Sequence, residues 1–87
     1  MGVRLLRISR VMDVSGFSRW KVYADVREGL FPPPVKIGAR CSAWPEPEVD
    51  DVLRARIAGR SEDEIKKIVA GLHAARNAGE VAATGRA

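Results

Sequence analysis

Basic and hydroxyl side chains between Ser18 and Ser42 are the residues whose types and spacing could do chemistry. Ser18-Arg-Trp-Lys21 stands at the start of a predicted helix, and Lys36 and Arg40 flank the turn of a predicted hairpin. Arginine and lysine side chains there can reach guanine O6 and N7 or phosphate, and the free N–H groups of a helix start can hold a phosphate. The predicted DNA-binding residues are Ser18, Arg19, Trp20, Lys21, Tyr23, Arg27, Lys36, Arg40 and Ser42.

Three residues of the second predicted helix have roles that the residue type alone leaves open. Trp20 either contacts thymine methyls or a sugar, or packs as a partly buried ring on the hairpin or on a partner subunit. Tyr23 can give its hydroxyl to a phosphate while its ring packs inward. Asp25 would repel phosphate, so we expect it to point sideways and pair with an arginine.

Other kinds of chemistry have little support in this sequence. Cys41 is the one cysteine and His73 the one histidine, so an intrachain disulfide is excluded, and a zinc cluster or a Cys-His dyad lacks ligands. We expect Cys41 to act as a small apolar residue and His73 to lie at the surface. No Gly-rich phosphate loop is present. We therefore expect no catalytic residues, metal or cofactor, and we predict that the protein is not an enzyme.

The elements that must position the basic residues follow from local signals. Ser9 is the predicted N-cap of a helix over 10–14, and Ser18 of a helix over 19–28 with Val22 and Val26 facing the core. Gly16 and Gly29 suit the left-handed ends of these helices. Two helices joined by a short turn with a glycine are typical of a helix-turn-helix. The strands predicted over 35–37 and 41–44 would then add a wing, with Trp44 as its anchor in the core.

The second half of the chain predicts two further helices. The first begins near Pro45 and Pro47 and ends near Gly59; the second follows the capping box Ser61-Glu-Asp-Glu64 and runs to about residue 75. The apolar stripe of this last helix either folds back on its own domain or contacts a partner; it comprises Ile65, Ile68, Val69 and Leu72. We divide the chain into a winged helix-turn-helix domain over 1–59, a C-terminal amphipathic helix over 60–76 and a flexible tail over 77–87.

Length and charge fit a small binding protein. The 87 residues make one domain with little room for a substrate cavity. Residues 1–44 carry eight Lys and Arg against three Asp and Glu, a net charge of +5, while the whole chain carries +4. A basic face of this kind concentrates polyanions. With no apolar run of about 20 residues and no signal-peptide pattern, we expect a cytoplasmic protein that does not enter a membrane.

From about Leu5 to Leu53 the sequence resembles the AlpA family of phage regulatory proteins, within the wider MerR-like and excisionase-like winged helix-turn-helix class. The resemblance rests on the order and spacing of several short motifs, which are Leu5-Leu-Arg-Ile-Ser9, Ser15-Gly-Phe-Ser-Arg19, Val22-Tyr23, Glu28-Gly-Leu-Phe-Pro32, Pro34-Val-Lys-Ile-Gly38, Arg40, Trp44 and Glu48-Val-Asp50. It implies a mainly α fold with a small β-hairpin and a protein of phages or mobile elements that binds double-stranded DNA.

The resemblance leaves the role of such a protein open. It implies either a transcription regulator or an excisionase that bends attachment-site DNA beside an integrase, with further copies of itself as possible partners. A small interaction module without a DNA role, such as an antirepressor, is the alternative from another class. The chain departs from the family pattern at Trp20, Lys21, Ala24 and Asp25, so the family's DNA target cannot be carried over.

Overall fold

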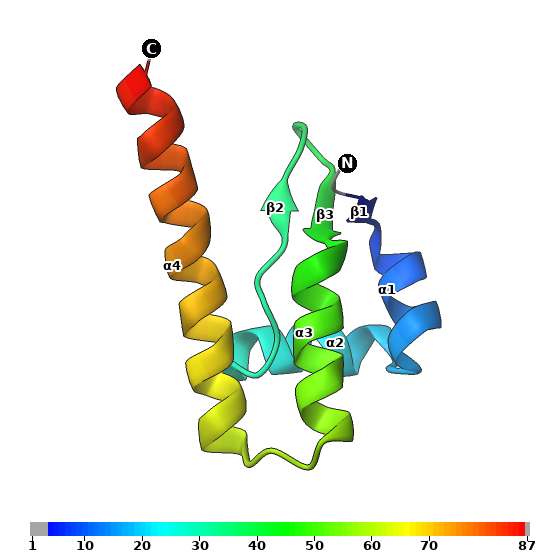
Figure 1. The fold of residues 1–87 in the computed structure, drawn as a ribbon. Helices are drawn as coiled ribbons and strands as arrows, with labels where there is room; N and C mark the ends of the chain where they lie inside the picture. Colours follow the sequence, from blue (N-terminus) through cyan, green and yellow to red (C-terminus); the bar gives the residue numbers. More distant parts are fainter. Residues whose placement is uncertain (1–3, 87) are drawn as a thin grey trace.

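The first two helices and the turn between them form a helix-turn-helix, as predicted. In a computed structural model, which describes the backbone of residues 4–86 and the side chains of residues 4–76, α1 spans Ile8–Ser15 and α2 spans Arg19–Glu28 (Figure 1). Both helices end on a left-handed glycine, Gly16 with φ 74° and Gly29 with φ 78°. A side chain with a Cβ would be strained there, which explains why glycine occupies both positions.

Of the N-caps predicted for the first two helices, one is confirmed and one is wrong. The Oγ of Ser18 accepts a hydrogen bond from the backbone N–H of Lys21 at 3.1 Å, as an N-cap does. Ser9 instead lies inside α1, because the N–H groups of Arg10 and Val11 both donate to the carbonyl of Arg7 at 3.0 Å. The first turn of α1 therefore closes on Arg7, which offers no side-chain cap.

A small antiparallel sheet carries the wing. Strands β2 (Val35–Lys36) and β3 (Ser42–Pro45) form the predicted hairpin to within a residue, with Lys36 opposite Ser42. Strand β1 (Leu5–Leu6) was not predicted, since two residues are too few to show an alternating pattern. It pairs with the other edge of β3, so the strand order is β1-β3-β2. The sheet thus ties the N-terminal segment to the base of the wing.

Helices α3 (Glu46–Ile57) and α4 (Glu62–Arg86) run antiparallel and side by side (Figure 1). The predicted capping box at the start of α4 is confirmed. Ser61 Oγ accepts from the Glu64 N–H at 3.2 Å, and the Glu64 carboxylate accepts from the Ser61 N–H at 3.0 Å. This backbone hydrogen bond, with the Ser61 hydroxyl and Arg60, holds the pKa of Glu64 below its usual value.

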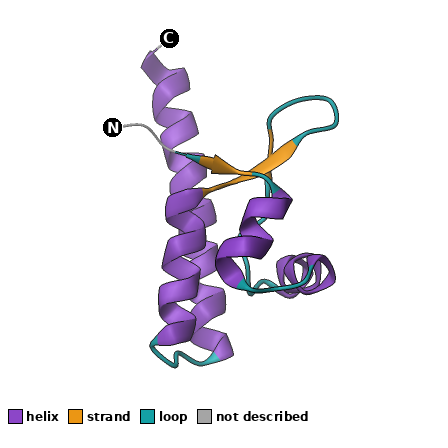
Figure 2. Cartoon of the chain, turned by 90° about the vertical axis from the view of Figure 1, so that its right-hand side faces the viewer, coloured by secondary structure: helices purple, strands orange, loops and turns teal. Residues whose placement is uncertain are grey.

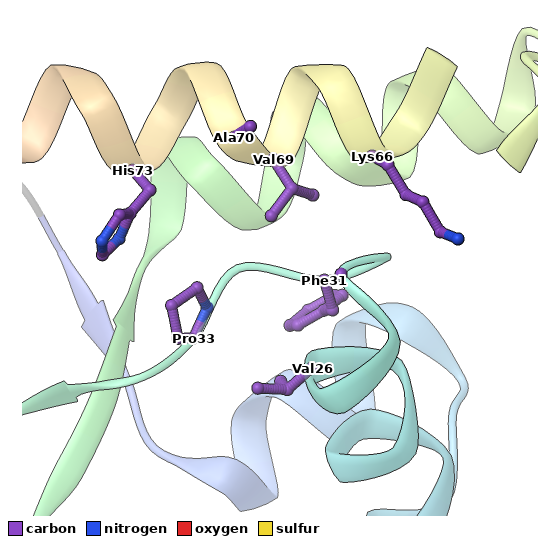
Figure 3. Close-up of a pocket in the computed structure, with 8 residues that line it drawn as sticks. Val26, Phe31, Pro33, Lys66, Val69, Ala70 and His73 are labelled. Atoms are coloured by element: carbon purple, nitrogen blue, oxygen red, sulfur yellow. The ribbon is translucent and has the colours of Figure 1, made fainter. Parts of the chain in front are cut away.

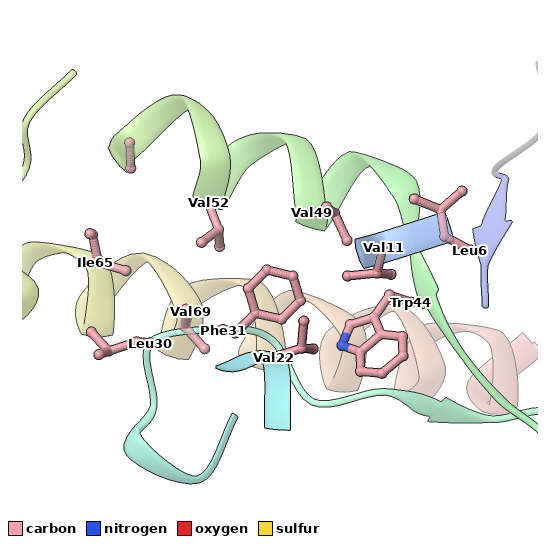
Figure 4. Packing of buried hydrophobic residues seen from close by; sticks show 11 residues of the cluster. Leu6, Val11, Val22, Leu30, Phe31, Trp44, Val49, Val52, Ile65 and Val69 are labelled. Carbon is pink, nitrogen blue, oxygen red and sulfur yellow. The ribbon is translucent and has the colours of Figure 1, made fainter. Parts of the chain in front are cut away.

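The apolar stripe of α4 folds back on its own domain. Ile65 and Val69 are 3% and 6% exposed and join the core, while Ile68 and Leu72 pack against it in partly buried positions. The structure therefore shows the first of the two alternatives, with α3 and the segment after α2 packed against the stripe. Figure 4 shows the core, with Phe31 and Trp44 below Val49 and Val52 of α3 and beside Val22 of α2.

Helix α4 is longer than predicted. It continues to Arg86 rather than ending near residue 75, since the sequence after Arg76 is rich in alanine and contains no proline to stop a helix. The structure describes no side chains after residue 76. The predicted flexibility of the tail over 77–87 therefore stays a prediction. None of the helices in the described part of the chain is long and apolar enough to span a membrane.

Candidate nucleic-acid interface

The start of α2 presents Arg19 and Trp20 to solvent. Arg19 is exposed, and Trp20 is 72% exposed. Packing of the ring as a partly buried group on the wing of its own chain, one of the alternatives for Trp20, is therefore not observed. A tryptophan this exposed contributes little to packing within the domain. Contact with DNA or with a partner remains as the prediction for Trp20.

Lys21 is held inside the protein's own charge network. Its Nζ lies 3.2 Å from the Asp25 carboxylate and 5.4 Å from the centroid of the Phe17 ring. Asp25 is only 4% exposed and also accepts from Nη2 of Arg56 at 2.8 Å. The predicted pairing of Asp25 with an arginine is confirmed. Lys21 can contact DNA only in competition with Asp25, so it is a weaker candidate than Arg19.

Arg56 was missed by sequence reasoning. It lies on α3, 31 residues from Asp25, and its guanidinium stacks over the Phe17 ring at 5.2 Å. Nothing in the local sequence connects two charges so far apart in the chain. The network fastens α2 to α3, and thereby fixes the angle at which the second helix leaves the core.

Tyr23 and Arg27 lie further along α2. The Tyr23 ring contacts Trp44 at a centroid distance of 5.9 Å while 36% of the residue stays exposed. This is the half-inward placement that was predicted for the ring. Arg27 is exposed in the last turn of the helix. Contacts of the Tyr23 hydroxyl or of Arg27 with phosphate stay predictions.

The wing places its two basic residues in solvent. Lys36 and Arg40 are exposed on either side of the loop, whose base is closed by a hydrogen bond from the Ile37 N–H to the Cys41 carbonyl at 2.9 Å. Ser42 is half-buried in β3. Ile37 is 47% exposed near the tip and was not singled out from the sequence.

Helix α2 and the wing project on one side of the molecule. Figure 2 shows the hairpin loop and α2, seen end-on, at the right of the view, with the long helix α4 at the left. The ion pairs of the described residues use other cations, namely Arg4, Lys21, Arg56, Arg60 and Arg76. In that part of the chain, Arg19, Arg27, Lys36 and Arg40 thus carry positive charges without an ion pair. An anionic ligand would meet them without first displacing a carboxylate.

A second surface feature lies between α2 and α4. It is an open, mainly apolar groove of about 340 Å³, lined by Val26, Gly29, Phe31, Pro33, Lys66, Val69, Ala70 and His73 (Figure 3). His73 lies at the surface, as predicted. Within residues 4–76 no group of three or more His, Cys, Asp or Glu side chains is placed to hold a metal ion.

Comparison with known proteins shows which family the N-terminal part of the chain matches. Residues 4–57 match the family described as prophage CP4-57 regulatory protein (AlpA). The chain is also 44% identical over 57 residues to the uncharacterized protein ORF88 of Enterobacteria phage P4. That alignment covers 66% of this chain and 65% of the relative's length. No solved structure matches. The family match ends at the last residue of α3, so α4 lies outside it.

Proposed function

We propose that this protein, which belongs to the AlpA family of prophage regulatory proteins, binds double-stranded DNA in a sequence-specific manner as a transcription regulator. The observation that carries the proposal is the placement of Arg19, Arg27, Lys36 and Arg40, which are exposed and free of ion pairs in the described residues, on α2 and the wing. In a helix-turn-helix the start of the second helix meets base edges in the major groove. A basic wing commonly follows the backbone or the minor groove.

The roles proposed for individual residues follow from their positions. Arg19 and Trp20 would read bases, and Ser18, Tyr23 and Arg27 would hold the flanking phosphates together with Lys36 and Arg40 of the wing. Lys21 would contribute only after leaving Asp25, and Ser42 would support the wing. We propose a binding protein rather than an enzyme, since the family is described as regulatory.

One domain of this size covers little DNA. A single small module contacts about 600–1,000 Å² of DNA, which is modest for a tight specific complex. We therefore propose that two or more copies bind adjacent half-sites. The proposal places the protein in the cytoplasm of a bacterial host, where its DNA targets are.

The affinity for DNA is expected to fall steeply with salt. If Arg27, Lys36 and Arg40 each neutralise a phosphate, the slope of log K against log salt should be about −2.7, from about −0.9 per phosphate. Fluorescence anisotropy with DNA from the parent element, titrated at several salt concentrations, gives this slope. A flat dependence on salt would contradict the proposal and favour an interaction module without a DNA role.

Arg19 and Arg40 are expected to differ in what they recognise. Arg19→Ala should weaken the specific site by about 1–3 kcal/mol more than random DNA if Arg19 reads a base. Arg40→Ala should weaken both DNAs equally, because phosphate contacts carry no sequence information. Binding curves for both variants on both DNAs make the comparison, and Lys67→Ala on the exposed face of α4 is the control for loss of one charge. If Arg19→Ala weakened the specific site and random DNA equally, as expected for Arg40→Ala, Arg19 would be only a phosphate contact.

Footprinting on the element's own DNA then separates the two roles of such a protein. Protection of a promoter supports the regulator. Protection of an attachment site with bending of the DNA would instead support an excisionase that acts beside an integrase. The exposed Ile37 at the tip of the wing gives that second role some support, since apolar side chains wedged between base steps kink DNA.

A further inference from the structure

The segment Pro32-Pro33-Pro34 connects α2 to the wing, and its backbone has few groups that can form hydrogen bonds. Proline carries no N–H group, so the hydrogen bonds of this segment must be made by its carbonyls. Nε1 of Trp44 donates to the Pro32 carbonyl at 2.7 Å from inside the core. Nη2 of Arg76 donates to the Pro33 carbonyl at 2.7 Å from the other side.

Arg76 links this segment to two helices at once. The residue lies on α4, and its guanidinium also binds the carboxylate of Glu48 through Nε, at 2.9 and 3.1 Å, and through Nη2. The two side chains keep only 20% and 12% of their surface exposed. Partly buried, bidentate pairs of this kind are stronger and more directional than pairs in open water. Glu48 itself stands in the first turn of α3, directly after β3.

On the side facing α4, the segment borders an open groove. Figure 3 shows Pro33 facing Val69 and His73 of α4 across the open groove between α2 and α4. Pro32 is fully buried, whereas Pro33 is partly exposed beside this open groove, so apolar packing surrounds Pro33 on fewer sides. The guanidinium of Arg76 supplies a directional contact that the groove does not.

We propose that α4 is a brace for the wing and that Arg76 is the positioning residue through which it acts. By donating to both the Pro33 carbonyl and the Glu48 carboxylate, Arg76 fixes the position at which β2 starts, and so the positions of Lys36 and Arg40. The proposal rests on the proposed DNA binding for its consequence, and it gives a role to the helix that lies beyond the family match. A binding surface that is already ordered loses less entropy when it binds.

The test uses the full chain, with DNA affinity as the first measurement. Arg76→Ala is expected to weaken DNA binding about three- to tenfold, in the range that lost preorganisation of one or two side chains costs. Lys67→Ala removes the same charge from α4 without touching the wing and should change affinity less than about twofold. Thermal melts show that each variant is folded at the assay temperature. If Arg76→Ala does not fold, Glu48→Gln weakens the same contact more gently and takes its place.

A double-mutant cycle separates a positioning role from a general loss of stability. If Arg76 acts through the wing, Arg40→Ala should cost less affinity in the Arg76→Ala background than in the wild type, while Arg19→Ala should cost the same in both. Additivity with both arginines, or unchanged affinity in Arg76→Ala, would overturn the proposal.

Amide exchange keeps the inference distinct from the proposed function. Protection of the Ile37 N–H, which donates to Cys41, should fall in Arg76→Ala and not in Lys67→Ala. If the wild type binds no DNA, the proposed function is wrong, and exchange at Ile37 still decides whether Arg76 braces the wing. Unchanged protection at Ile37 would overturn the brace.

Discussion

Replacing Trp44 by alanine is expected to lower the free energy of unfolding by about 3–5 kcal/mol. The side chain is 0% exposed, and its ring lies 6.3 Å from Phe31 and 5.9 Å from Tyr23, centroid to centroid. Its removal opens a cavity at the centre of the core and leaves the Pro32 carbonyl without the donor Nε1. Since small domains are stable by only about 5–15 kcal/mol, this variant should unfold at mild temperature. Urea and thermal denaturation followed by circular dichroism measure the loss.

The second tryptophan is the matched control for this prediction. Trp20 is 72% exposed, so Trp20→Ala should change stability by about 0.5 kcal/mol or less. Trp44→Phe keeps an aromatic ring but not the donor and should fall between the two. A melting temperature of Trp44→Ala close to that of the wild type would mean that the ring does not organise the core. A large loss from Trp20→Ala would show that this ring packs on another copy.

Most of the fold could be predicted because its signals are local. Gly16, Gly29 and the Ser18 cap mark the ends of the first helices within a few residues, and the capping box does the same for α4. The signals failed where a choice depends on tertiary contacts. Strand β1 exists because β3 offers it an open edge. Helix α1 begins before Ser9 because the chain leaving β1 already brings the Arg7 carbonyl into position.

The candidate site could be predicted only as a set of residues on two elements. Spacing along α2 placed Arg19 away from the core face of Val22 and Val26, and Arg19 is exposed in the structure. Spacing could not show that Lys21 is held by Asp25 and Arg56, nor that Arg76 joins Glu48 and Pro33, 28 and 43 residues away in the chain. Long charged side chains reach partners that no local pattern encodes, and their pairing decides which cations stay available for a ligand.

The buried carboxylate of Asp25 leads to the second large expected effect. Asp25→Ala should lower the free energy of unfolding by about 3 kcal/mol, at the lower end of the range for removing one member of a buried pair. The reason is that Arg56 loses its carboxylate partner while its side chain is only 27% exposed. The Nε of Arg56 is already buried without a hydrogen-bond partner in the described residues, so little remains to compensate its charge. Chemical denaturation measures the change.

Two further variants show whether the loss of stability comes from the charge of Arg56 that is left without a carboxylate partner. Lys21→Ala should cost about 1 kcal/mol or less, because the Lys21 side chain is 41% exposed and water replaces much of the interaction. The double variant Asp25→Leu with Arg56→Met removes both charges and should recover most of the stability lost in Asp25→Ala, since apolar replacements of similar size are often neutral for a buried pair. A double variant as unstable as Asp25→Ala would show that the network stabilises through its hydrogen-bond geometry. Near-normal stability of Asp25→Ala itself would show that Arg56 swings into solvent, and α2 would then be fixed by Val22 and its neighbours in the core alone.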